Sequence, residues 1–144
     1  MDHFQIIRFN YTDSQLMSSA FVIREQVFIK EQNVPVDLER DSYDMEAIHY
    51  ILYDGETPLA AARRRRTDKG IKLERFAVLS DHRNRGLGSS ILKYVLKDIQ
   101  DERVLIYLNS QEAAVPFYER HGFKKKGKAF MEAGIRHYMM IYNA

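Results

Sequence analysis

The sequence contains no cysteine, and this absence removes several kinds of chemistry at once. It excludes disulfides, thiolate zinc sites and cysteine nucleophiles, and nothing else in the chain indicates an oxidising compartment. Long hydrophobic runs are also absent, because Asp2, Arg8 and Asp13 interrupt the first twenty residues. Neither the apolar core of a signal peptide nor a membrane span can be placed there, so we expect a cytoplasmic protein without a membrane partner.

A large surplus of one charge is lacking as well. The chain has 22 Lys and Arg against 20 Asp and Glu, and its net charge of +2 is too small to indicate a nucleic-acid partner. Hydrophobic residues make up 45% and charged residues 29%, which is the balance of a folded globular chain. With 144 residues and no repeats or linker, we expect residues 1–144 to form one domain.

The hydrophobic pattern predicts a mixed α/β fold. Helical spacing begins at Leu16, where Ser14 is expected to cap the helix, and it recurs at 87–99 and 113–120. The acidic segment 31–45, which contains Pro35, is expected to form a long loop or broken helix at the border of a site. Strands are expected at 4–9, 48–53, 58–66, 71–79, 104–108, 123–130 and 135–142, with turns at Asp54-Gly55 and 68–70.

Two glycines, Gly86 and Gly88, lie between the strand expected at 71–79 and the most strongly amphipathic helix. Glycine lets a ligand approach the backbone, and the N–H groups at a helix start bind anions, to which Arg83 and Arg85 add positive charge. Glycines in such a place are also common as simple turn residues, so a phosphate site and a plain turn are both open. The Gly-Lys-Ser/Thr of a Walker loop is absent, and the spacing differs from a dinucleotide fingerprint.

Two motifs resemble those of the GNAT superfamily of N-acetyltransferases. Arg83-x-x-Gly86-x-Gly88 resembles the Gln/Arg-x-x-Gly-x-Gly/Ala signature of the loop that binds the coenzyme A pyrophosphate. Ala114-x-x-Phe117-Tyr118-x-x-x-Gly122-Phe123 resembles the second motif, in which the tyrosine lies near the cofactor sulfur. Three further stretches are similar to the ElaA/YjcF-like branch: Val27-Phe28-x-x-Glu31-Gln32-Asn33-Val34-Pro35, Leu73-Glu74-Arg75 and Gly134-Ile135-x-His137.

The resemblance implies a fold, an activity and a cosubstrate. The fold would be a central mixed, mostly antiparallel sheet, splayed between its fourth and fifth strands and flanked by about four helices. The activity would be transfer of an acetyl group from acetyl-CoA to a primary amine, by direct attack in a ternary complex and without a metal. The acceptor would be a small-molecule or protein amine and not a nucleic acid. The resemblance leaves open whether the protein forms a homodimer.

The resemblance also implies which residues hold the cofactor. The pantetheine arm would enter between the splayed strands and pair with backbone at 76–78, with the Val78 amide as donor to the oxyanion. Many relatives have Asn three residues before the motif alanine, where this chain has Gln111, so either Asn109 or Gln111 would contact the arm. The complete set is Phe76, Ala77, Val78, Arg83, Asn84, Arg85, Gly86, Leu87, Gly88, Ser89, Asn109, Gln111, Phe117 and Tyr118.

Glu74 and Tyr118 are the candidate catalytic residues. Glu74 lies two positions before Phe76, which predicts that both face the same side of the strand, and it would accept the amine proton; the alternative is a cross-strand ion pair. Tyr118 would protonate the leaving thiolate, and its alternative is core packing. His49 and His137 are open candidates on the acceptor side, and none of the five histidines has metal-ligand spacing.

Charged runs allow further interpretations. Arginines 63–66 would alternate across a strand, so we expect a solvated face paired with acidic neighbours, with contact to an anionic acceptor as the alternative. Lys124 to Lys126 predict an exposed strand edge. The acidic segment 31–45 would suit a cationic amine if it lines the acceptor side. Two other functions are open: a noncatalytic acyl-CoA-binding protein, and a small nucleic-acid-binding module that would leave both motifs unexplained.

Overall fold

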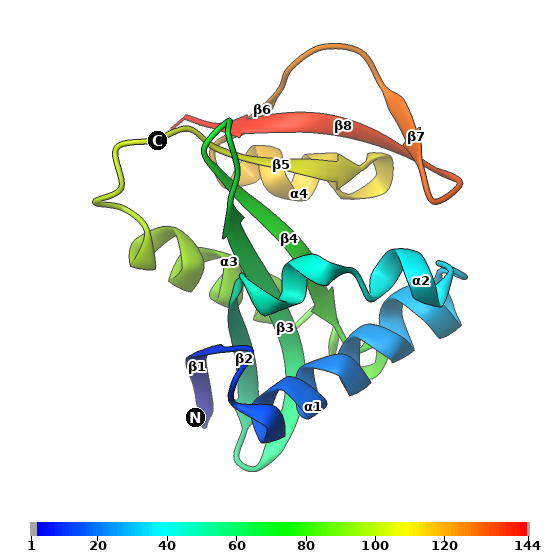
Figure 1. Cartoon of the computed structure of the whole chain (residues 1–144), viewed down its shortest axis with the longest axis vertical. Coiled ribbons are helices and arrows are strands. Elements are labelled where there is room, and N and C mark those ends of the chain that lie inside the picture. The colour runs from blue at the N-terminus through cyan, green and yellow to red at the C-terminus, as the bar shows by residue number, and fades with distance from the viewer. Residues whose placement is uncertain (1–2, 144) are drawn as a thin grey trace.

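One mixed sheet organises the protein, whose computed structural model describes residues 3–143 (Figure 1). Its strand order is β1-β2-β3-β4-β5-β8-β6, with β7 paired to β8, and every pair is antiparallel except β4 with β5. This confirms the predicted fold class. The strands are β1 (Phe4–Asn10), β2 (Ile48–Asp54), β3 (Thr57–Arg66), β4 (Ile71–Val78), β5 (Ile106–Gln111), β6 (Phe123–Lys125), β7 (Phe130–Glu132) and β8 (Ile135–Tyr142).

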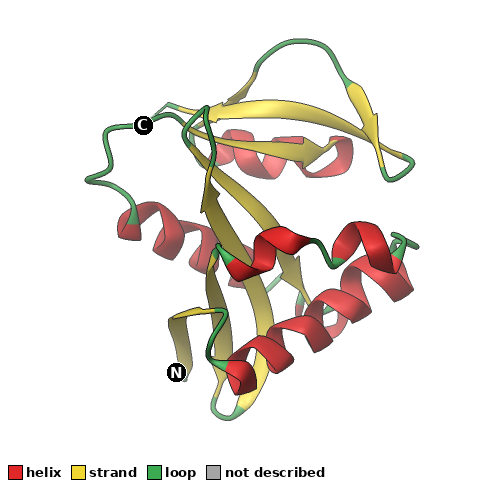
Figure 2. Ribbon diagram, in the orientation of Figure 1, coloured by secondary structure: helices red, strands yellow, loops and turns green. Residues whose placement is uncertain are grey.

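Helices cover both faces of the sheet (Figure 2). The helices are α1 (Ser14–Arg24), α2 (Val36–Glu39), α3 (Leu87–Asp98) and α4 (Val115–Arg120); α1 continues into a π-helical segment, Glu25–Glu31. Alternate residues of β3 face the two layers, because side chains alternate across a strand. Ala60 and Ala62 belong to the core with α3, whereas Ala61 belongs to the core with α1. Short 3-10 helices lie at Ser42–Met45, Ser80–His82 and Glu112–Ala114.

The parallel pair β4 and β5 separates after only three residues. Ile71–Leu73 pairs with Ile106–Leu108, and no pairing between these strands continues beyond Leu73 in the described residues. A bulge in β4 begins at this point: Arg63 is opposite Glu74 but Ala61 is opposite Ala77, so β4 has one extra residue. The bulge contains Arg75 with φ of 56°, a left-handed conformation that is rare for a residue with a Cβ. The sheet therefore splays where the resemblance implied.

Two local predictions were wrong. The expected strand at 123–130 is two short strands, β6 and β7, because Gly127 turns the chain between them with φ of 84°. Asp13 caps α1 in place of Ser14, since its side chain accepts a hydrogen bond from the Leu16 N–H at 3.1 Å. The acidic segment is a loop that carries α2 and a 3-10 turn, as the sequence indicated, and it crosses the front of β3 and β4 (Figure 1).

Candidate functional site

A cleft of about 820 Å³ opens where β4 and β5 separate. Leu87 and Ile91 of the α3 layer line it on one face of the sheet, and Val27 and Phe28 of the α1 layer line it on the other. The gap between the strands is thus open to both faces. Two ligands can meet in such a cleft from opposite sides, one against α3 and α4 and the other under α2.

On the α3 side, the start of the helix presents backbone donors to the cleft. Gly86 is the N-cap with φ of 77°, no side chain caps the helix, and the first helical bond runs from Ser90 N–H to the Gly86 carbonyl at 3.0 Å. The N–H groups of Leu87, Gly88 and Ser89 precede that bond, so they are available to an anion. All these residues except Ser90, together with Asn84, line the cleft. The arrangement suits an anion, and the binding of a diphosphate here stays a prediction.

The two loop arginines differ in position. Arg83 lines the cleft, donates from Nε to the Val78 carbonyl at 3.0 Å, and is held by Glu31 through bonds of 2.6 and 2.7 Å. The hydrogen bond from Arg83 lowers the pKa of the Glu31 carboxyl. Arg85 is not among the residues lining the cleft; it contacts Nδ1 of His82 at 2.8 Å and lies over the Phe4 ring. Only Arg83 of this pair is therefore placed beside the helix start.

The uncovered edge of β4 supplies further backbone groups. The Leu79 N–H donates to the Leu59 carbonyl at 3.0 Å, so Leu79 faces β3. Because amides alternate along an antiparallel strand, those of Phe76 and Val78 face away from β3. On that same side, the Val78 carbonyl accepts a hydrogen bond from Arg83. Ala77 lies opposite Ala61, and its amide is on the β3 side. Of the three predicted backbone partners, Phe76 and Val78 face the gap.

Tyr118 lies in an aromatic group beside this edge. Its ring is edge-on to Phe117 at 5.1 Å, to Phe76 at 6.4 Å and to Phe123 at 5.7 Å, and it lines the cleft. Burial raises the pKa of the Tyr118 hydroxyl, so the group keeps its proton at neutral pH. Tyr118 both packs against these rings and lines the cleft, and its catalytic role stays a prediction. Tyr118 satisfies the core-packing interpretation without losing access to the cleft.

Both candidate amides of β5 reach the cleft. Asn109 and Gln111 line it, and they lie two positions apart on the same strand. Nε2 of Gln111 donates to Oε1 of Gln32 at 2.8 Å, which joins β5 to the end of the π-helical segment. Asn109 has no such side-chain bond among residues 3–143. The choice between the two as a contact of the pantetheine arm stays a prediction.

Glu74 has surroundings that disfavour the role of a base. Its carboxylate lies 2.9 Å from Arg63, 2.8 Å from Arg65 and 3.0 Å from Lys72. Burial alone would raise the pKa of Glu74, but these three cations outweigh it and lower the pKa to about 2. Arg63 is also the register partner of Glu74, which is the cross-strand pairing that the sequence left open.

The predicted orientation of Glu74 was wrong. Phe76 packs in the layer of α3 and Tyr118, whereas Glu74 bonds to Arg63 and Arg65 under the acidic segment. The extra residue of the bulge at Arg75 reverses the alternation, so residues two apart face opposite sides. The role of general base for Glu74 stays a prediction that these contacts do not favour.

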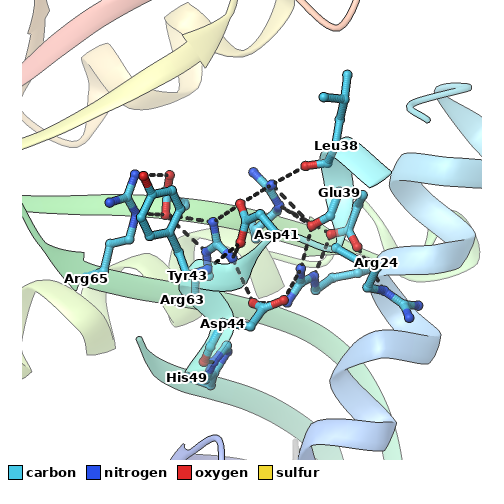
Figure 3. Close-up of polar contacts among 12 residues, drawn as sticks. Arg24, Leu38, Glu39, Asp41, Tyr43, Asp44, His49, Arg63 and Arg65 are labelled. Atoms are coloured by element: carbon cyan, nitrogen blue, oxygen red, sulfur yellow. Dashed lines mark hydrogen bonds and ion pairs between the residues drawn. The ribbon is translucent and has the colours of Figure 1, made fainter. Parts of the chain in front are cut away.

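A larger ionic network continues from Glu74 toward α1 (Figure 3). Arg63 is fully buried and bonds Asp41 and Asp44 at 2.7 Å, and Arg24 bonds Asp44 at 2.8 Å and Glu39 at 2.6 Å. Burial would raise the pKa of Asp44, but Arg24 and Arg63 overcome it and lower the value. The prediction of a solvated arginine face was thus wrong for Arg63. The carboxylates of this network neutralise arginines and are not free to attract a cationic amine.

The sequence interpretation missed Arg24, Glu39 and Asp44 as members of a buried network. Arg24 lies in the helix expected from Leu16 onward, and it is 1% exposed. One signal was available, because an acidic segment and four consecutive arginines are complementary in charge. Alternation along β3 did hold: Arg64 bonds the Tyr50 hydroxyl and Arg66 bonds Glu102 on the other face of the sheet.

The two candidate histidines, His49 and His137, differ in their position relative to the cleft. His49 is buried away from the cleft, where Nε2 contacts the Asp44 carbonyl at 2.9 Å and burial lowers the pKa of the ring. His137 lines the cleft, with Nδ1 at 2.7 Å from the Ile135 carbonyl and Nε2 at 3.7 Å from Glu132. Lys124 and Lys125 are exposed on β6, at the end of the strand order, as expected.

Residues 3–143 hold no group of three His, Asp or Glu side chains placed to bind a metal ion. Across the same residues, no helix combines the length and the apolar character needed to cross a membrane.

Comparison with known proteins gives consistent matches. The model of the acetyltransferase (GNAT) domain matches residues 9–144. The Bacillus subtilis protein YjcF, described as an uncharacterized N-acetyltransferase, is 43% identical over 131 residues, which cover 90% of this chain and 94% of YjcF. The crystal structure of Escherichia coli ElaA is similar, with 19% identity and a TM-score of 0.87, and the match covers 97% of this chain and 99% of ElaA. A GNAT family acetyltransferase from Elizabethkingia anophelis, solved with acetyl-CoA bound, has a TM-score of 0.65 at 14% identity, covering 98% of this chain and 96% of its own.

Proposed function

The chain belongs to the GNAT acetyltransferase family, and from this we propose that it transfers an acetyl group from acetyl-CoA to a primary amine in a ternary complex. One observation carries the proposal: a single cleft joins the uncapped start of α3, the free edge of β4 and Tyr118. A related fold has been solved with acetyl-CoA bound. Acetyl-CoA is thus the cosubstrate that this cleft fits best.

Residues of the α3 side would hold the cosubstrate. The N–H groups of Leu87, Gly88 and Ser89 would bind its diphosphate, and Arg83 would add charge beside them. The amides of Phe76 and Val78 would pair with the pantetheine arm from one side. Asn109 or Gln111 would contact that arm from β5, where the splay leaves room between the two strands.

The chemistry requires a new C–N bond, loss of the C–S bond and removal of one amine proton. The amine would attack the thioester carbonyl, whose oxygen would accept a hydrogen bond from the Val78 amide. Tyr118 would donate a hydrogen bond, and then its proton, to the departing sulfur. Burial favours the protonated hydroxyl, so the hydrogen bond is the stronger part of this role. Water would accept the amine proton, since Glu74 is held as an anion by three cations.

A second candidate is a protein that binds acyl-CoA without turnover. It is favoured by the ion pairs of Glu74, which withdraw the one carboxylate predicted to act as base. A nucleic-acid-binding module has less support, because the arginines of β3 are ion-paired and divided between two faces.

The test measures binding and turnover separately. Acetyl-CoA and coenzyme A should raise the unfolding temperature, because they bind only the folded chain, whereas pantetheine should raise it much less. Free-thiol release from acetyl-CoA across a library of amines then tests the reaction. Stabilisation without thiol release from any amine would support the noncatalytic candidate, and absence of both would reject the proposed function.

A further inference from the structure

The ionic network under α2 contains more positive than negative charge. Glu74 pairs with three cations, of which Arg63 has two other carboxylate partners. Arg65 and Lys72 pair with Glu74 alone among residues 3–143. In the whole network six cations, Arg24, Arg40, Arg63, Arg65, Lys72 and Arg75, share four carboxylates, Glu39, Asp41, Asp44 and Glu74. An excess of two positive charges results, and part of it lies at Arg65 and Lys72.

Arg65 and Lys72 are held in place and face the cleft. Both line it, with side chains 13% and 16% exposed. The guanidinium of Arg65 stacks over the Tyr43 ring at 3.7 Å, and its Nε donates to Glu74 at 2.8 Å (Figure 3). A guanidinium has five N–H donors and an ammonium has three, so one shared carboxylate leaves several of them unused. The two side chains thus form a preorganised pair of donors with little water around them.

Their position is on the acceptor side of the sheet. Lys72 and Glu74 precede the bulge and alternate with Leu73 of the α3 core, so they lie on the face covered by the acidic segment, whereas the start of α3 lies on the other face. A ligand that meets the thioester from under α2 would therefore pass these cations. Lys72 precedes Phe76 by four residues, which is ~13 Å along an extended strand before the bulge shortens it.

We propose that Arg65 and Lys72 bind an anionic group of the acceptor. The acceptor is then a primary amine that carries a carboxylate or a phosphate several atoms away from its nitrogen. This inference rests on the proposed transfer to an amine. The opposing feature is Glu132, which lines the cleft from β7 and is 54% exposed, because it would attract a second positive charge instead. A diamine is accordingly the competing acceptor class.

Four acceptors of equal chain length separate these classes: 6-aminohexanoate, 6-aminohexyl phosphate, 6-aminohexanamide and 1,6-diaminohexane. Thiol release from acetyl-CoA gives kcat/KM for each. We expect kcat/KM for one or both anionic acceptors to exceed that for the amide by about tenfold or more, which is the gain that a hydrogen bond between charged groups provides. The two anionic arms identify which group the site takes. Preference for the amide or the diamine would overturn the proposal.

The variants Arg65→Met and Lys72→Met test the residues themselves. Each should lower the ratio of kcat/KM for 6-aminohexanoate over the amide by about tenfold. Arg66→Met is the matched control, since Arg66 is the next residue, is 58% exposed and pairs with Glu102 on the opposite face. It should keep the wild-type ratio. An unchanged ratio in both cleft variants would overturn the assignment, and the coenzyme A thermal shift verifies that each variant is folded.

A binding measurement separates failure of this inference from failure of the proposed function. Calorimetry should detect binding of 6-aminohexanoate to the coenzyme A-saturated protein and weaker binding in Lys72→Met. Binding that persists without turnover of any amine would reject acetyl transfer but retain the anion site. Turnover without preference for anions, or equal binding of acid and amide, would reject the anion site and retain acetyl transfer.

Discussion

The two ends of the cleft are built by different means. The α3 end uses backbone groups from a short stretch of chain, residues 76–89, and only one charged side chain there lines it beside the helix start. The end under α2 uses side-chain charges from α2, β3, β4 and the loop between α2 and β2. Backbone donors suit a cosubstrate of constant shape. Side chains can change by substitution, so they suit the ligand that distinguishes one acetyltransferase from another.

The difference also predicts unequal tolerance to substitution. A backbone site depends on conformation and is sensitive at few positions, such as Gly86 with its positive φ. A buried ionic network loses stability when a central member is removed, because several partners then lose part of their charge neutralisation where little water can replace it.

The largest effect is expected for Arg63→Leu. Removing this buried guanidinium leaves Asp41, Asp44 and Glu74 short of a partner, which should lower the free energy of unfolding by ~3–5 kcal/mol. Arg66→Leu is the control, and its exposed pair should contribute less than ~1 kcal/mol. Urea denaturation measures both. Similar losses in the two variants would mean that burial of the network has no special energetic role.

Tyr118→Phe is expected to act on the rate and not on the fold. The variant keeps the ring contacts with Phe117 and Phe76 but removes the hydroxyl, so kcat should fall by ~10²-fold. The loss should shrink with a thioester whose thiol has a lower pKa, because such a thiolate leaves with less help. Steady-state kinetics with both donors provides the measurement. A wild-type rate with acetyl-CoA, at unchanged stability, would leave Tyr118 with a packing role alone.

Gly86→Ala should weaken coenzyme A binding by about tenfold. A Cβ at Gly86 would meet nothing within 4 Å, so the penalty comes from its φ of 77° and amounts to ~1–2 kcal/mol. Gly127 is a matched control with φ of 84° and equally open space, but it lies outside the cleft. Gly127→Ala should lose similar stability and keep the wild-type affinity for coenzyme A. Calorimetric titration decides, and equal affinities in the two variants would argue against the phosphate loop.

The smallest expected effect is a loss of stability in acid that depends on Glu74. The pKa of Glu74 is lowered in the folded protein, so its ion pairs contribute stability fully above its ordinary value near 4.5 and lose it as pH falls toward 2. Wild type should therefore lose more stability than Glu74→Gln between pH 5 and pH 3. Denaturation midpoints at several pH values test this. Parallel curves would show that the carboxylate is not strongly paired, and a large rate loss in the variant at pH 7 would instead support the role of base.

Sequence patterns correctly predicted features set by neighbouring residues. Alternation along β3 follows from strand geometry alone, and the amphipathic pattern of α3 requires one face to be buried. The position of the glycine loop before α3 was also predicted, and the positive φ at Gly86 is a conformation that favours glycine. Phosphate binding by this loop stays a prediction. These features depend on interactions within a few residues.

Tertiary structure decided what depends on partners far along the chain. The bulge at Arg75 arises between β3 and β4, and it reversed the expected orientation of Glu74 and Phe76. Arg24 is buried because Glu39 and Asp44 fold over it, which the helical pattern around it does not indicate. Burial of a charge is tolerated only when its partners are in place. The sequence therefore determined most of the elements and the position of the glycine loop, whereas packing between distant segments decided the charge and the side-chain orientation at the end of the cleft under α2.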